Sequence, residues 1–88
     1  MRFTKSNNAD KYIVDDDKID EAIQKLALFE NMCDEFKKDM KNLPERLEKL
    51  RVQKKEKTVA YKELVAQKLI NTNILMFFKR HGINIDEF

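Results

Sequence analysis

Residues that interrupt helices are scarce in this sequence, which has one Gly, one Pro and no Trp among its 88 residues. Sheet proteins turn often, and their turns draw on Gly, Pro, Asn and Asp. A chain with few such breakers and much Lys, Glu, Leu and Ala is instead typical of long helices. The composition therefore predicts an all-α fold, in a chain long enough for one small domain.

Cysteine and histidine each occur once, as Cys33 and His81, so an internal disulfide and the common zinc sites are excluded. The sequence contains no run of about 18 apolar residues that could span a membrane. Residues 1–10 also lack the apolar core of a secretory signal. We expect a cytoplasmic protein with a reduced thiol, no cofactor and no membrane contact.

Signatures of catalysis are missing as well, since there is no Gly-rich phosphate loop and no spacing of nucleophile and base or of metal ligands. The consecutive acids Asp15, Asp16 and Asp17 come nearest to a metal site, but a calcium loop needs a Gly and a Glu at ligand spacing. Acids of this kind cap the first turn of a helix. With Asp15 as N-cap, Val14 and Ile19 have the spacing of a hydrophobic staple. We expect a non-enzymatic protein with no catalytic residue, metal or small-molecule substrate.

Residues 1–14 are predicted to form an N-terminal arm that is flexible or docked. Residues 4–10 show no apolar periodicity. Residues 12–14, Tyr-Ile-Val, are a short apolar run that suits a docked extended segment. The first helix is therefore expected to begin after this arm, at residue 15.

From residue 19 onward, apolar residues recur at alternating spacings of three and four, which is the pattern of a coiled-coil seam. The members of this seam are Ile19, Ala22, Leu26, Phe29, Cys33, Phe36, Met40 and Leu43. Because Cys33 lies on the seam between Phe29 and Phe36, we expect a buried and unreactive thiol rather than a nucleophile.

Pro44 is the one clear interruption in the middle of the chain. Proline in a helix interior loses a hydrogen bond and clashes with the preceding turn, and Asn42 followed by Glu45 has capping-box spacing. We therefore predict one helix over about 15–42 and a second over about 44–81. A continuous helix through Pro44 is the alternative, because the apolar spacing continues through Leu43 and Leu47.

The end of the second helix is marked by the only glycine, Gly82, in the position that favours a left-handed residue. Phe78 and Ile83 then take the two positions that touch in a Schellman motif. Lys79, Arg80 and His81 place cations at the negative end of the helix, which explains His81 without catalysis. Residues 15–82 are thus predicted to be a helical hairpin, followed by a short tail over 83–88.

Charge is divided unevenly between the two predicted helices. Residues 15–35 carry eight acids and two bases, and residues 46–68 carry eight bases and three acids. A reversal at Pro44 brings these blocks side by side in an antiparallel hairpin. Each exposed ion pair contributes little, but the pattern disfavours other registers.

The second helix is apolar on two faces, and one neighbouring helix covers only one of them. The sequence therefore predicts a coiled-coil-like hairpin that forms a homodimer in a four-helix arrangement. The expected self-association interface consists of Ile70, Ile74, Phe77 and Phe78. The corresponding function is a protein–protein interaction module that acts through self-association and through a further protein partner.

Two other functions remain open. Lys54, Lys55 and Lys57 form a basic patch, which suits a small DNA- or RNA-binding or regulatory protein. The acidic block expected beside them weakens this hypothesis, because it would neutralise part of their charge. The third hypothesis is a helical adaptor that captures a partner helix in a groove near residues 66–78.

Overall fold

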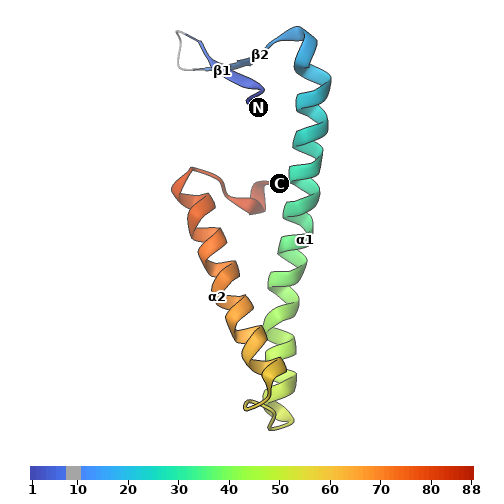
Figure 1. The fold of residues 1–88 in the computed structure, drawn as a ribbon, viewed down its shortest axis with the longest axis vertical. Helices are drawn as coiled ribbons and strands as arrows, with labels where there is room; N and C mark the ends of the chain where they lie inside the picture. Colours follow the sequence, from blue (N-terminus) through green and yellow to red (C-terminus); the bar gives the residue numbers. More distant parts are fainter. Residues whose placement is uncertain (8–10) are drawn as a thin grey trace. The chain divides into compact units, whose positions relative to one another are not determined.

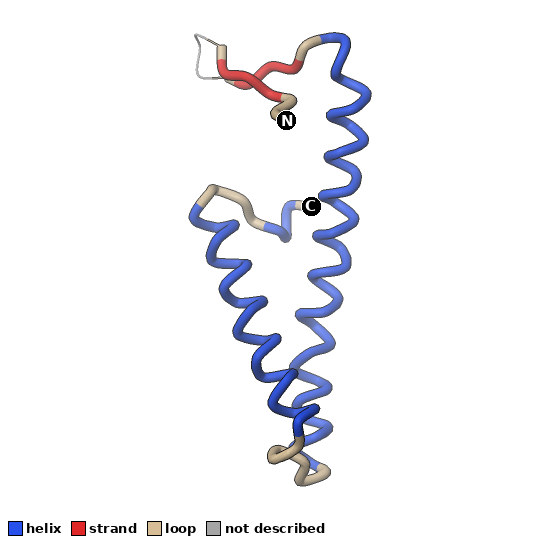
Figure 2. Tube along the Cα trace, in the orientation of Figure 1, coloured by secondary structure: helices blue, strands red, loops and turns tan. Residues whose placement is uncertain are grey.

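The computed structural model describes residues 1–7 and 11–88, so part of the predicted arm, residues 8–10, lies outside the described residues. The chain is mostly helical and carries one small sheet (Figures 1 and 2). It divides into two compact units, Met1–Met32 and Cys33–Phe88, and each is described by itself. The elements are β1 (Thr4–Ser6), β2 (Tyr12–Val14), η1 (Asp16–Lys18), α1 (Ile19–Val52), α2 (Val59–Arg80) and η2 (Ile85–Glu87).

The first unit contains an antiparallel β-hairpin, which corrects the all-α expectation. Strands β1 and β2 pair with Lys5 opposite Ile13. Asn7 ties the strand ends together, because its backbone N–H donates to the Lys11 carbonyl at 2.8 Å and its side chain accepts from the Lys11 N–H at 3.1 Å. The extended segment predicted over residues 12–14 is confirmed as β2.

The helical part of the first unit begins where the sequence places it. Asp15 is the N-cap of η1 in an extended conformation, and its backbone carbonyl accepts from Lys18 N–H at 2.9 Å. Its side chain makes no capping bond and instead pairs with Lys5 Nζ at 2.7 Å. Asp15 therefore occupies the predicted N-cap position. Its carboxylate does not cap the helix but links the start of the helix to β1 through Lys5.

Helix α1 runs without a break through Pro44, so the predicted helices over 15–42 and 44–81 are wrong in their shared boundary. Pro44 is exposed, whereas Leu43 and Leu47 beside it are only 5% and 6% exposed. Continuing the helix keeps this apolar seam buried, and that gain exceeds the loss of one backbone hydrogen bond at the proline.

The chain reverses about ten residues later, over residues 53–58. Lys54 adopts a left-handed conformation (φ 57°), and Lys55 N–H donates to the Leu50 carbonyl at 2.9 Å, as in a Schellman motif that usually holds glycine. Thr58 then caps α2, since its hydroxyl accepts from the Tyr61 N–H at 3.3 Å. Within the second unit, α2 returns beside the later part of α1 and lies closest to it near this loop (Figure 1).

The second unit has a small core. Its buried apolar residues include Leu43, Leu47, Ile85 and Cys33, which is 0% exposed, and the prediction that Cys33 is buried is confirmed. The C-terminal segment contributes Ile85, and Lys37 Nζ donates a hydrogen bond to the backbone carbonyl of Phe88. The tail over residues 83–88 therefore packs against α1 at the end of the helix pair that lies away from the loop.

The predicted end of α2 is confirmed in detail. Gly82 has φ 77°, its N–H donates to the Lys79 carbonyl at 3.0 Å, and Ile83 N–H donates to the Phe78 carbonyl at 2.9 Å. These two bonds define the Schellman motif. Asn84 follows and caps η2, because its side chain accepts from the Asp86 N–H at 3.0 Å.

Candidate interaction surface

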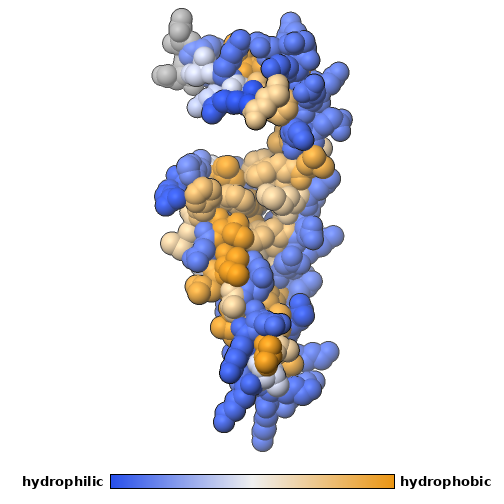
Figure 3. Space-filling model, in the orientation of Figure 1, coloured by the Kyte–Doolittle hydropathy of each residue, from blue (hydrophilic) through white to orange (hydrophobic). Residues whose placement is uncertain are grey.

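Helix α2 presents large apolar side chains to solvent along one side, and Figure 3 shows apolar surface gathered over this helix. These side chains are between 46% and 64% exposed. We call this set the outer face of α2: Val65, Leu69, Ile70, Met76 and Phe77. An exposed apolar stripe on a soluble helix is typical of an interaction surface.

The opposite side of α2 packs on α1. Its half-buried or buried positions include a set with spacings of three, seven, four and three residues, which suit a helix seam: Tyr61, Leu64, Asn71, Leu75 and Phe78. Contacts identify α1 as the neighbour, since Arg51 donates to the Tyr61 hydroxyl at 3.3 Å and Leu64 lines a hollow with Leu43. At about 100° per residue, the outer face points away from this seam.

The four predicted interface residues lie within about 100° of one another around α2 and differ in their exposure. Ile70 and Phe77 lie on the outer face, 50% and 52% exposed. Ile74 and Phe78 are only partly exposed and lie toward the seam. Two of the four are therefore among the exposed residues of the outer face, and the other two border it on the side of the seam.

Phe77 is held in place by two neighbours on its own helix. The Arg80 guanidinium lies 5.1 Å from the ring centroid, and the His81 ring centroid lies 4.8 Å away at an interplanar angle of 56°. Cation–π and tilted aromatic contacts of this kind favour a fixed ring orientation. Phe77 is thus a half-exposed aromatic with a cation against it, and aromatic residues and Arg are enriched at the cores of protein interfaces.

Asn71 is a polar residue on the seam of α2, and sequence analysis missed its position. It is 5% exposed, and Gln67 Nε2 donates to its Oδ1 at 2.8 Å. Because Gln67 lies on the same helix, this bond satisfies the Asn71 side-chain oxygen without a partner on α1. The spacing from Leu64 to Leu75 could have placed Asn71 on the side of α2 that faces α1, but only with the chain reversal at residues 53–58.

The predicted basic patch lies in the reversal loop. Lys54, Lys55 and Lys57 are all exposed, and in the described part of the chain none of them belongs to an ion pair. The hollow at the first turns of α2 is shared with Arg46 and Lys49 of α1. Later residues of α1, rather than the acidic block over residues 15–35, therefore lie beside the first turns of α2, and the predicted pairing of the acidic and basic blocks within one chain is wrong.

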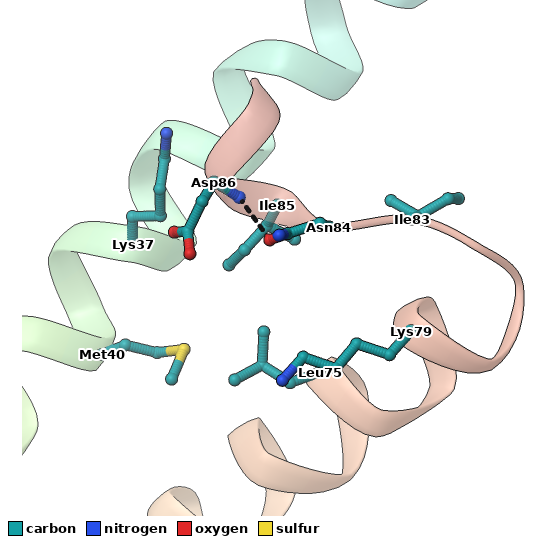
Figure 4. Close-up of a pocket in the computed structure, with 8 residues that line it drawn as sticks. All are labelled: Lys37, Met40, Leu75, Lys79, Ile83, Asn84, Ile85 and Asp86. Atoms are coloured by element: carbon teal, nitrogen blue, oxygen red, sulfur yellow. Dashed lines mark hydrogen bonds between the residues drawn. The ribbon is translucent and has the colours of Figure 1, made fainter.

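The hollows lined by the described residues include two more. Met40 and Leu75 point into one of them from α1 and α2, Ile85 lies at its far side, and the stems of Lys37 and Lys79 border it (Figure 4). The second lies in the first unit, is almost entirely apolar, and will be called the apolar hollow. It is lined by Phe3, Thr4, Val14, Ile19, Ala22, Ile23 and Leu26.

Among residues 1–7 and 11–88, no three His, Cys, Asp or Glu side chains are grouped so that they could hold a metal ion. Across the same residues, no helix has the length and apolar character needed to cross a membrane. No family model matches the chain, and neither the curated proteins nor the solved structures include a match. Functional inference therefore depends on the surfaces described above.

Proposed function

We propose that this chain is a non-enzymatic, helical protein–protein interaction module of the cytoplasm that forms a homodimer through the outer face of α2. The observation that carries the proposal is the set of five large apolar side chains, about half exposed on one side of one helix. Apolar patches of more than a few hundred Å² are rare on monomeric soluble proteins. Two hairpins joined in this way place four helices in one assembly.

The energetics support self-association. Burying a large apolar side chain yields about 1.5–3 kcal/mol, or roughly half of that here because each is already half covered. Association costs about 4–15 kcal/mol in lost freedom of motion. Ten such side chains, five from each copy, would yield about 8–15 kcal/mol, which is comparable with this cost. A two-fold axis requires only surfaces that one chain already carries.

Light scattering on the purified protein, with substitutions on and off the outer face, tests this proposal. The variants Ile70→Asp and Phe77→Asp each place a carboxylate in the contact and should yield monomers. The matched control is Val52→Asp, because Val52 is also apolar and 72% exposed but lies at the end of α1. Circular dichroism should show unchanged helix content in all three variants.

A wild-type protein that stays monomeric contradicts the proposal. If it then binds amphipathic helical peptides through residues 66–78, the adaptor hypothesis replaces self-association. If Val52→Asp dissociates the dimer and Phe77→Asp does not, the interface lies outside the outer face of α2.

Nucleic-acid binding by the reversal loop is the second candidate function. It is favoured by the exposure of Lys54, Lys55 and Lys57 and by the basic residues, rather than the acidic block, beside the first turns of α2. Phosphate contacts of this type give a mobility shift that weakens steeply with salt. Replacing the three lysines by Gln should abolish such a shift. A shift that is unchanged by these substitutions, or absent at low salt, removes this candidate.

A further inference from the structure

The outer face of α2 and the apolar hollow of the first unit have complementary chemistry. Helix α2 carries four bases and one acid, so two α2 helices facing each other would bring like charges together. Residues 19–32 of α1 carry three acids and one base. At 22 residues, α2 is also too short to accompany the 34 residues of α1. The better-matched occupant of the outer face is therefore the acidic start of α1.

We propose that Phe77 of one copy inserts into the apolar hollow of a second copy, with Arg80 of the first copy paired with Glu30 of the second. This inference rests on the proposed self-association and specifies which surfaces meet. Around a two-fold axis the contact is made twice, once in each direction, which closes a dimer.

The hollow suits an aromatic side chain. Its walls are the β-hairpin, through Phe3 and Val14, and the first turns of α1, through Ile19, Ile23 and Leu26. These side chains are apolar, and several remain substantially exposed within the chain, Ile23 at 55% and Leu26 at 50%. A buried aromatic anchor that fills an apolar pocket is the usual centre of a protein interface.

Charge places Arg80 opposite Glu30. On α1, Glu30 lies about one turn beyond Leu26 and on the same side of the helix as Ile19 and Ile23, by the helical period. Its side chain is exposed and belongs to no ion pair in the part of the chain that the structure describes. Arg80 lies against the Phe77 ring, so an aromatic seated in the hollow brings its cation toward this acid.

Reciprocal charge reversal in the full chain tests the pairing. Glu30→Lys alone and Arg80→Glu alone should each weaken the homodimer about tenfold or more, because each puts like charges together at both contacts. An equimolar mixture of the two variants should recover wild-type affinity, since every contact in the mixed dimer again joins opposite charges. The matched control is Glu21→Lys, an exposed acid on the opposite side of the same helix.

Each outcome of sedimentation velocity on these proteins has a distinct meaning. If Glu30→Lys weakens the dimer no more than Glu21→Lys does, the pairing of Arg80 with Glu30 is overturned, but self-association remains intact. Rescue in the Glu30→Lys/Arg80→Glu double variant without rescue in the mixture also overturns it, because the charges then meet within one chain. A monomeric wild type overturns both proposals.

Discussion

Gly82 ends α2 in a backbone conformation that costs other residues energy. With φ 77° and no atom within 4 Å of an added Cβ, an alanine there meets backbone strain but no clash. Gly82→Ala should therefore lower the free energy of unfolding by about 1–2 kcal/mol. Gly82→Asn should cost less, because asparagine tolerates the left-handed region. Urea denaturation of the three proteins measures both values, and an unaffected Gly82→Ala would mean that the Schellman motif does not form.

Cys33 reports on the packing of α1. Its side chain is 0% exposed, and a thiol shielded in this way reacts only when the structure opens. Ellman's reagent should label the native protein far more slowly than the urea-unfolded protein. Equal labelling rates in the two states would show that the α1 seam is open in solution.

The ion pair of Lys5 and Asp15 makes the stability of the β-hairpin depend on pH. The hydrogen bond from Lys5 and the positive charge of its ammonium lower the pKa of Asp15 below its usual 3.8. The same hydrogen bond and the negative charge of the Asp15 carboxylate raise the pKa of Lys5 above 10.5. The carboxylate's contribution to stability is present above pH 3.8 and is lost as the pH falls through the lowered pKa. The ammonium's contribution is present below pH 10.5 and is lost as the pH rises through the raised pKa.

An NMR titration measures this coupling directly. In Lys5→Gln the pKa of Asp15 should return upward toward its usual value, because both effects of the ammonium are removed. The nearby variant Lys11→Gln serves as the control, since Lys11 forms no ion pair in the described residues. An Asp15 pKa that is the same in wild type and Lys5→Gln would contradict the pairing.

At the scale of elements, the continuity of α1 through Pro44 has a measurable cost. Proline in a helix interior is about 3 kcal/mol less favourable than alanine, and Pro44 is exposed, so its side chain contributes little burial. Pro44→Ala should raise the free energy of unfolding by about 1–3 kcal/mol, whereas Glu45→Ala, its exposed neighbour, should change it little. A destabilised Pro44→Ala would place the chain reversal at residue 44 after all.

Local signals in the sequence were sufficient for some elements and not for others. The three-and-four seam predicted α1, and Gly82 predicted the end of α2, because both depend on residues close together in the chain. The reversal was misplaced because Pro44 has a strong local preference that the buried Leu43 and Leu47 override. The actual turn uses Lys54 in a left-handed conformation, which has no compositional signature.

At the scale of the whole molecule, the position of the reversal decides which surfaces are exposed. The sequence showed that the second helix is apolar on more than one side, which predicted a further partner for it. It did not show which side faces α1, because moving the turn by about ten residues changes every pairing along the hairpin. Ile70 and Phe77 are accordingly on the outer face, while Ile74 and Phe78 lie toward the seam.

The mass of the protein in solution decides whether the outer face of α2 joins two copies of this chain. At about 100 μM, the protein concentration in sedimentation equilibrium is far above a micromolar dissociation constant, so a dimer of that affinity would be the main species. We expect twice the chain mass of 10.5 kDa for the wild type, and the single chain mass for Phe77→Asp. A wild type that sediments as a single chain at this concentration would contradict the claim.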